Sequence, residues 1–174
     1  MTPPIHTERL TLRPWREGDL PSLDAILGDP DVMEFSEAGP LSVPQQAAWL
    51  AGPRAGMACY GLPGTLAIEL RGQGTVIGYV SLTRDLERVA SNEAEIGFRL
   101  ATSHWGFGYA SEAAKAVIEA DTGTCGTDRI VAIVDPHNLR SLHVLEKLGM
   151  TYARDIMFDG YDYPDHLLTL PVPP

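Results

Sequence analysis

Two glycines just ahead of a strong helix pattern are the residues of this sequence best suited to bind a ligand. Gly106 and Gly108 precede a run whose apolar residues recur at the spacing of one helical face: Ala110, Ala113, Ala114, Val117 and Ile118. Glycine lets a backbone pass close to a ligand with its N–H groups uncovered, and a helix N-terminus carries about half a positive charge. The turn is therefore predicted to hold a phosphate or pyrophosphate. The alternative is a tight strand-to-helix connection that needs glycine for geometry alone.

The elements that would position this turn are short and mixed in type. Apolar patterning predicts strands at 9–13, 64–70, 75–82, 93–100 and 130–134, then a hairpin of 152–158 and 161–170 that turns at Asp159-Gly160. Helices are predicted at 20–27, 42–50, 110–118 and, capped by Asn138, at 139–148. The fold class is thus α/β (α+β): a mixed, mainly antiparallel sheet of about six to seven strands with about four helices, rather than a repeating doubly wound sheet.

Length and composition are those of an ordinary globular protein. The 174 residues suit one domain, 1–174, and 44% of them are hydrophobic and 21% charged. No apolar run reaches the roughly 18 residues that cross a bilayer. Residues 1–11 lack the basic start and apolar segment of a signal peptide, so we expect a cytoplasmic protein.

The chain is strongly acidic, with 13 basic and 23 acidic residues and a net charge of −10. Such a field disfavours nucleic acid and anionic membranes as partners and mildly favours amines and other cations. Cys59 and Cys125 form no CxxC pair, so we expect reduced thiols rather than a disulfide or a metal pair. The five histidines show no metal-binding spacing, so no metal site is predicted.

Five motifs in this order resemble the GNAT (general N-acetyltransferase) superfamily: 95–100 (EIGFRL), the 105–113 turn and helix start, 130–136, Asn138 with Ser141, and 145–150 (LEKLGM). The opening segment 7–15 is similar to the branch that acetylates the N-termini of ribosomal proteins, which also holds many small-molecule acetyltransferases. The resemblance covers 7–170 and implies a GNAT fold, acetyl-CoA as donor and an amine as acceptor, either a peptide N-terminus or a small molecule. It also permits a homodimer.

The resemblance places the pyrophosphate of the donor on the glycine turn. The usual pattern is Arg or Gln, two residues, Gly, one residue, then Gly or Ala; here Trp105 stands where Arg or Gln would be. Phe107 fills a place that is often polar or basic, so a cationic phosphate contact is missing and donor affinity could be lower. The implied pyrophosphate residues are Trp105, Gly106, Phe107, Gly108, Tyr109, Ala110 and Ser111.

The same resemblance assigns the pantetheine arm of the donor to two other segments. Backbone groups of Phe98, Arg99 and Leu100 would pair with its amides like an added strand. Asn138 and Ser141 match positions that contact the arm and the thioester. Simpler roles stay open: Arg99 as a solvated edge charge, and Asn138 as a plain helix N-cap.

Acetyl transfer to an amine needs a base, because an ammonium must lose its proton before it attacks. Glu95 is the candidate, since it lies on the strand where this superfamily often carries its base. Glu93 shares that strand face, so it could act instead or raise the pKa of Glu95 by like charge. Two solvated glutamates on a surface strand are the alternative.

The tyrosine that serves many relatives as general acid does not carry over, because Leu145 stands in its place. Ser141 lies one helical turn earlier on the same side and is the candidate to hydrogen-bond the departing thiolate. A serine bonded to local backbone is the alternative, and Tyr109 is interpreted as a packing residue. A backbone N–H of 98–100 would hold the oxyanion, and transfer could also proceed mostly by proximity.

Acceptor contacts are expected from Met33, Glu34 and Phe35 and from the terminal hairpin. An N-terminal α-amine has a pKa near ~7.7–8.0 against ~10.4 for lysine, so it asks less of the base and is slightly favoured. The hairpin residues, which either receive a positive amine or form a solvated turn, are Asp155, Asp159, Asp162, Asp165, Tyr161 and Tyr163.

Two rival functions fit parts of the sequence. A catalytically silent coenzyme A-binding module, acting as a sensor or partner, is consistent with Phe107 and Leu145. A P-loop nucleotide-binding enzyme would suit the glycine turn, but it needs Gly-Lys-Ser/Thr, and 108–111 contains no lysine. We therefore expect an acetyl-CoA-dependent N-acetyltransferase.

Overall fold

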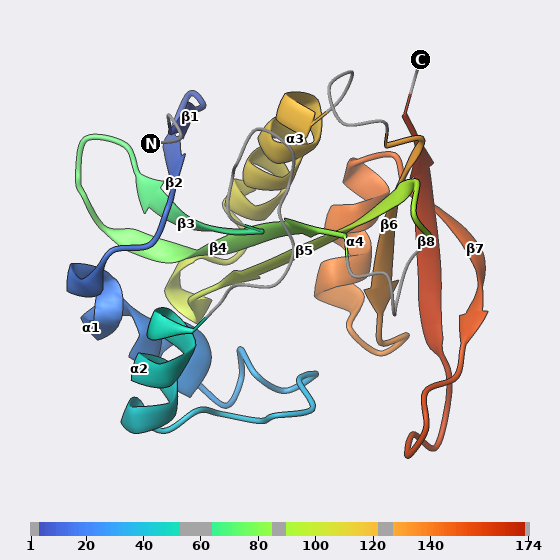
Figure 1. The fold of residues 1–174 in the computed structure, drawn as a ribbon, viewed down its shortest axis with the longest axis horizontal. Helices are drawn as coiled ribbons and strands as arrows, with labels where there is room; N and C mark the ends of the chain where they lie inside the picture. Colours follow the sequence, from blue (N-terminus) through green and yellow to red (C-terminus); the bar gives the residue numbers. More distant parts are fainter. Residues whose placement is uncertain (1–3, 53–63, 85–89, 122–126, 173–174) are drawn as a thin grey trace.

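The centre of the molecule is one mixed eight-stranded sheet, seen in a computed structural model that describes residues 4–52, 64–84, 90–121 and 127–172 (Figure 1). The strand order is β1-β2-β3-β4-β5-β6-β8-β7. Neighbours are antiparallel except β5 and β6, which are parallel. The strands are β1 Ile5–His6, β2 Leu10–Arg13, β3 Thr65–Leu70, β4 Val76–Thr83, β5 Glu93–Leu100, β6 Arg129–Val134, β7 Thr151–Ile156 and β8 Asp165–Pro171.

Helices pack on both faces of the sheet. On one face α1 (Leu20–Leu23) continues into a π-helical turn, Asp24–Gly28, and lies beside α2 (Val43–Ala51) at one corner of the molecule (Figure 1). The other face is covered by α3 (Tyr109–Asp121) and α4 (Leu139–Lys147), whose apolar side chains join the larger core. The α1/α2 face has a core of its own, built from Trp15, Leu23, Ile26, Leu27, Met33, Ala67, Val76 and Ala101.

The sheet opens between β5 and β6. Their parallel pairing covers three residue pairs, from Glu93 opposite Arg129 to Glu95 opposite Val131. Beyond these pairs β5 is bonded to β4 alone and β6 to β8 alone within the described chain. The edge of β5 at 96–100 therefore faces a gap, where an extended ligand can pair with backbone groups.

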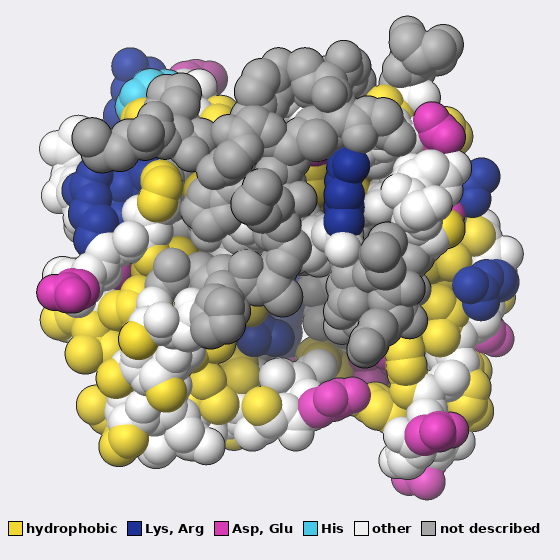
Figure 2. All heavy atoms as spheres, viewed as in Figure 1, with side chains coloured by type: hydrophobic (Ala, Val, Ile, Leu, Met, Phe, Trp, Pro, Cys, Tyr) yellow, Lys and Arg dark blue, Asp and Glu magenta, His cyan; other side chains and the backbone are white. Residues whose placement is uncertain are grey.

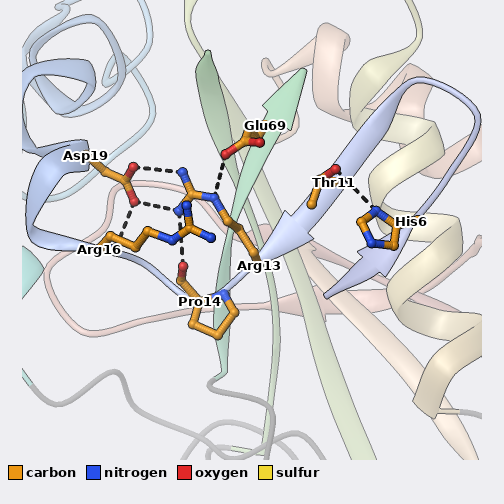
Figure 3. A network of polar contacts seen from close by, with 7 residues as sticks. All are labelled: His6, Thr11, Arg13, Pro14, Arg16, Asp19 and Glu69. Carbon is orange, nitrogen blue, oxygen red and sulfur yellow. Dashed lines mark hydrogen bonds and ion pairs between the residues drawn. The ribbon is translucent and has the colours of Figure 1, made fainter. Parts of the chain in front are cut away.

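A buried ion-pair cluster joins β2 to β3 and to the turn Glu17–Asp19 that precedes α1 (Figure 3). Arg13 on β2 donates to both carboxylate oxygens of Asp19 at 2.8 Å and to Glu69 on β3 at 2.6 Å. These carboxylates raise the pKa of Arg13. Burial alone would raise the pKa of Asp19, but hydrogen bonds from Arg13 and from the backbone of Arg16 hold it below its usual value.

The predicted fold class is confirmed, with eight strands instead of six to seven. The additional strand is β1, whose two residues pair with Leu12 and Thr11. Two residues are too few to show a period-two pattern, so the pairing partner rather than the local sequence makes this strand.

The predicted tight hairpin at Asp159-Gly160 is wrong in its extent. β7 ends at Ile156 and β8 begins at Asp165, so a loop of 157–164 replaces the two-residue turn. Side chains from this loop reach other segments: Tyr161 donates to Glu37, and Tyr163 donates to Asp135. These contacts tie the loop to distant segments of the chain, and the local turn residues do not reveal them.

Both cysteines, Cys59 and Cys125, lie outside the described residues, so the expectation of reduced thiols stays a prediction. In the described ranges, none of the helices has the length and apolar character needed to cross a bilayer. The same ranges contain no group of three or more His, Cys, Asp or Glu placed to hold a metal ion.

Candidate functional site

A cavity of about 960 Å³ opens where β5 and β6 separate. Its wall combines the open half of β5, the start of α3, the first turns of α4, the segment 31–38 and the β7–β8 loop. Both halves of the sheet and both of these loops therefore meet at one space. The predicted donor and catalytic residues in this wall are Glu95, Phe98, Arg99, Leu100, Trp105, Gly106, Gly108, Tyr109, Ala110, Ser111, Asn138 and Ser141.

The glycine turn presents backbone donors to this cavity. Gly106 and Gly108 have φ of 81° and 83°, in the left-handed region that favours glycine. The Glu112 N–H donates to the Gly108 carbonyl at 3.1 Å, so the amides of 109–111 precede that helical bond. Backbone donors and the positive end of the helix dipole thus meet at the cavity wall, an arrangement suited to an anion.

Phe107 is turned away from the cavity. The residue is 59% exposed, and its ring stacks on that of Tyr109 with the centroids 5.8 Å apart. It does not belong to the described cavity wall, unlike its neighbours Gly106 and Gly108.

Arg9 holds the glycine turn in place, a role that the sequence did not reveal. Its guanidinium contacts the Glu112 carboxylate at 2.6 and 2.7 Å and donates to the Phe107 carbonyl at 2.9 Å. Thr7 donates to the same carboxylate. Burial would raise the pKa of Glu112, but the hydrogen bonds from Thr7 and Arg9 lower it. Because 103 residues separate Arg9 from Glu112, no local pattern could have found this pair.

Trp105 joins the turn to β5 and carries a cation above its ring. Its Nε1 donates to the Leu100 carbonyl at 2.8 Å. The guanidinium carbon of Arg140, on the first turn of α4, lies 4.2 Å from the centroid of the ring. Arg140 also contacts the carboxylate of Glu34 at 3.3 Å. The turn has Trp105 where the GNAT pattern has Arg or Gln, and the cation Arg140 of α4 lies against the ring of that tryptophan.

The side chains of β5 alternate between the two faces of the sheet. Phe98 and Leu100 pack into the core beneath α3 and α4. Arg99 lies on the opposite face, where its guanidinium carbon is 5.8 Å from the ring of Tyr79 on β4. Burial raises the pKa of Tyr79. The backbone of 98–100 therefore lies along the gap, as an added-strand contact requires.

The structure brings Glu95, and not Glu93, to the cavity. Glu95 is the last β5 residue in register with β6, opposite Val131, and it lies in the cavity wall. Glu93 accepts from the Ala90 N–H and from Arg129, each at 3.1 Å, outside the described wall. Glu95 thus occupies the vertex of the opening, where the two strands part.

The start of α4 is built as the sequence indicates. The Asn138 side chain accepts a hydrogen bond from the Ser141 N–H at 3.1 Å, which confirms the N-cap role. Asn138 and Ser141 both lie in the cavity wall. Leu145, one turn further along, is 2% exposed within the larger core, so the place of the relatives' tyrosine is apolar here.

The predicted acceptor residues of the first half divide between core and cavity. Met33 is buried in the α1/α2 core and does not belong to the described wall. Phe35 lies in the wall. Tyr161 also lines it and donates to Glu37, so the 31–38 segment and the β7–β8 loop touch across the cavity.

The predicted aspartates divide in the same way. Asp165 lies in the wall, whereas Asp155 accepts from Tyr152 at 3.1 Å on the exposed strand β7. Asp159 and Asp162 lie outside the described wall, as the solvated-turn interpretation expects. Figure 2 shows acidic side chains over the tip of the β7–β8 loop, at the lower right of that view.

Asp135 is a cavity residue that sequence reasoning missed. It accepts from the His137 N–H at 2.7 Å and from the Tyr163 hydroxyl at 2.8 Å. Burial would raise the pKa of Asp135, but these two bonds lower it, and the carboxylate in turn raises the pKa of Tyr163. An aspartate that bonds the backbone two residues on is an Asx turn, a local signal that could have found it.

Comparison with known proteins identifies the family of this fold and site. The family model described as "Acetyltransferase (GNAT) domain" matches residues 9–151. An uncharacterized protein of Bacillus subtilis (strain 168), YkkB, is 32% identical over 152 residues, which cover 86% of each chain.

Two solved structures share the architecture. The acetyltransferase from Agrobacterium tumefaciens str. C58 superposes with a TM-score of 0.78 at 28% identity, over 98% of this chain and 95% of that one. RimL, a ribosomal L7/L12 alpha-N-protein acetyltransferase solved with coenzyme A, has the same fold, with a TM-score of 0.76 at 19% identity over 97% and 98% of the two chains. The chain therefore belongs to the GNAT acetyltransferase family.

Proposed function

We propose that this protein is an acetyl-CoA-dependent N-acetyltransferase that moves an acetyl group to a primary amine by direct transfer. The observation that carries the proposal is a single cavity with the glycine turn, whose geometry suits an anion, at one end and a carboxylate at the other. The turn is 105–108, and the carboxylate is Glu95 at the vertex of the β5–β6 opening. Glu95 and Leu100 lie five positions apart on β5, a span of roughly 17 Å.

The residues present fit the donor along this span. The amides of 109–111 suit its pyrophosphate, and the open β5 edge at 96–100 suits the amides of its pantetheine arm. Asn138 and Ser141 line the other side of the same space. Acetyl-CoA supplies the acetyl group as a thioester, and the residues of the chain align that thioester with the amine.

The chemistry assigned to the chain is proton transfer and charge stabilisation. Glu95 accepts the proton that the ammonium must lose, directly or through water. A backbone N–H of 98–100 donates to the oxygen that becomes negative when the amine attacks. As the new C–N bond forms and the C–S bond breaks, the sulfur leaves as a thiolate that accepts a hydrogen bond from the Ser141 hydroxyl. The attacking nitrogen gives up its excess proton, which reaches the thiolate through water and makes it a thiol.

The acceptor side supports an amine whose protonated form is cationic. The net charge of −10 attracts cations, and Asp165 and Glu95 contribute carboxylates to the wall. We propose a peptide N-terminus or a small-molecule amine, as in RimL, whose name describes an alpha-N-protein acetyltransferase. We place the reaction in the cytoplasm, where both acetyl-CoA and such acceptors occur.

The test is thiol release from acetyl-CoA with a panel of amines: Ala- and Ser-initiated peptides, polyamines, aminoglycosides and free amino acids. We expect turnover with one acceptor class. Glu95→Gln should lower kcat by about 10²–10⁴-fold, because it removes the general base without changing side-chain size. Coenzyme A affinity, measured by calorimetry, should stay the same in this variant.

The matched control is Glu93→Gln, on the same strand face but paired with Arg129 away from the cavity. We expect it to keep the wild-type kcat, and a loss in this variant with none in Glu95→Gln would move the base to Glu93. Tight coenzyme A binding without turnover on any amine would favour a silent sensor module instead.

A further inference from the structure

We propose that Arg140 binds the pyrophosphate of the donor, exchanging its contact with Glu34 for one with the phosphates. The inference rests on the proposed function, since it assumes that coenzyme A lies in the cavity. It assigns to α4 the positive charge that the glycine turn does not contain.

The turn needs a cation from elsewhere. Its residues 105–108 are Trp-Gly-Phe-Gly, so it offers the ligand backbone N–H groups and no positively charged side chain. A pyrophosphate carries charge that backbone amides alone meet only in part, and an ionised donor makes a stronger hydrogen bond than a neutral one. A second element that delivers a cation to this turn would complete the site.

Arg140 is placed to do so. It lies on the first turn of α4 and belongs to the wall of the same cavity as the glycine turn. Its guanidinium carbon is 4.2 Å from the centroid of the Trp105 ring. A cation–π contact of this kind holds the planar group over the turn and leaves its N–H donors directed outward from the ring.

The present partner of Arg140 is one that a phosphate can displace. The Arg140–Glu34 contact is a single N–O approach at 3.3 Å between side chains that are 58% and 56% exposed. Exposed pairs of this kind are weak, whereas arginine and phosphate form two parallel hydrogen bonds. The exchange therefore replaces a weak contact with a stronger one.

Arg9, the other arginine near the turn, is committed elsewhere. It contacts the Glu112 carboxylate at 2.6 and 2.7 Å and donates to the Phe107 carbonyl at 2.9 Å. Releasing it would break the brace that shapes the turn. Arg9 thus supports the turn, and Arg140 is the arginine of the cavity wall that lies against Trp105 of the turn.

Calorimetric binding of three probes tests the assignment: coenzyme A, dephospho-coenzyme A and pantetheine, which lacks the pyrophosphate. Arg140→Gln should raise the Kd of both coenzymes by about 10- to 100-fold, the loss expected for a hydrogen bond to a charged group. The Kd of pantetheine should not change. The Kd of Arg140→Lys for both coenzymes should lie between those of the wild type and Arg140→Gln. A lysine keeps the positive charge but cannot form the two parallel hydrogen bonds of a guanidinium.

Two further variants sharpen the result. Glu34→Gln should tighten coenzyme A binding several-fold, because it removes the competitor of the phosphates. Lys115→Gln is the matched control: Lys115 is an exposed cation of α3 that contacts Glu119 at 3.8 Å, and it lies outside the described cavity wall. It should leave the affinity for coenzyme A unchanged.

Each other outcome overturns the proposal. Equal losses with pantetheine would mean that Arg140 acts through the packing of Trp105. A loss with coenzyme A but not with dephospho-coenzyme A would assign Arg140 to the 3′-phosphate instead. Wild-type affinities in Arg140→Gln would exclude any contact, and failure of the wild-type protein to bind coenzyme A would refute the proposed function itself.

Discussion

Arg13 is a buried cation that the fold can hold only with two carboxylates beside it (Figure 3). Taking a guanidinium out of water is costly, and the bidentate contact with Asp19 together with Glu69 offsets that cost. Asp19 also accepts a hydrogen bond from the Arg16 backbone N–H, so the same carboxylate holds the turn that precedes α1. Removing one partner would leave the positive charge incompletely paired in the interior.

The acid sensitivity of the protein should follow from Asp19. Its pKa is lower in the folded protein than the usual 3.8, so its contribution to stability is present above that value and is lost as the pH falls through the folded pKa. Asp19→Asn should lower the free energy of unfolding at pH 7 by about 3–5 kcal/mol. It should also flatten the decline below pH 4. Urea unfolding across this range measures both effects.

Glu17→Gln is the matched control for this prediction, since Glu17 lies two residues away on the exposed side of the same turn. We expect its unfolding curve to follow the wild type at every pH. An equal acid decline in Asp19→Asn and the wild type would assign the sensitivity to another carboxylate.

Single residues could be predicted from the sequence where their partners are near in the chain. Asn138 was predicted as a cap because its partner, Ser141, is three residues away. Arg9 and Arg140 escaped notice because their partners lie 103 and 106 residues away, and nothing local marks an arginine that will meet Glu112 or Glu34. The glycine turn was predicted from its own residues, because two glycines precede a helical pattern, whereas Glu95 came from family resemblance. The structure adds that both reach one cavity.

At the scale of elements, β4 and β5 approach so closely at Gly78 that no side chain fits between them. A Cβ there would lie 2.2 Å from the Arg99 carbonyl oxygen and 2.6 Å from a methyl group of Leu100. These two residues belong to the edge that is proposed to pair with the donor. Gly78 therefore controls where that edge lies.

Gly78→Ala should destabilise the protein by about 1–3 kcal/mol, because the new methyl group must push β5 away from β4. It should also weaken coenzyme A binding, since 98–100 would move with the strand. Gly18→Ala is the control, because a Cβ at Gly18 meets no atom within 4 Å. Thermal unfolding and calorimetry on the two variants measure these effects, and equal behaviour of both would contradict the steric argument.

Elements with a long periodic pattern were predictable, and those made by distant contacts were not. The observed β5 (Glu93–Leu100) has the bounds that the sequence predicts, and α2 begins after Ser42, whose capping box with Gln45 was within reach of sequence reasoning. The β7–β8 loop was missed because Tyr161 and Tyr163 bond residues 124 and 28 positions away.

The whole molecule carries a negative field that acts differently on its two proposed substrates. A net charge of −10 attracts a cationic acceptor and repels an anionic donor. On the face shown in Figure 2, acidic side chains lie beside the 29–41 segment and over the β7–β8 loop, which together border the proposed acceptor side. The local charge of Arg140 then opposes the overall field at the donor end.

Salt should therefore separate the two substrates. Raising ionic strength from 0.01 to 1 M shortens the Debye length from about 30 to 3 Å. The kcat/KM for a polycationic acceptor should fall steeply over this range, while that for a peptide without net charge should change little. Steady-state kinetics at fixed, saturating acetyl-CoA measures both, and parallel declines would show that the field does not select the acceptor.

The three-pair ladder between β5 and β6 leaves an unfinished sheet in the middle of the molecule. An unpaired strand edge can pair with a strand of another protein. This edge lies inside a cavity lined by loops and helices, so the narrow pantetheine arm of the donor fits there and a second protein does not. A bound donor would occupy the gap and accept and donate the hydrogen bonds that β6 does not make with β5. Because a ligand that binds only the folded state raises the free energy of unfolding with the logarithm of its concentration above Kd, the lifetime of this enzyme in the cell would follow the supply of its own substrate. A fall in the acetyl-CoA concentration would then lower the amount of folded enzyme as well as the rate of the reaction.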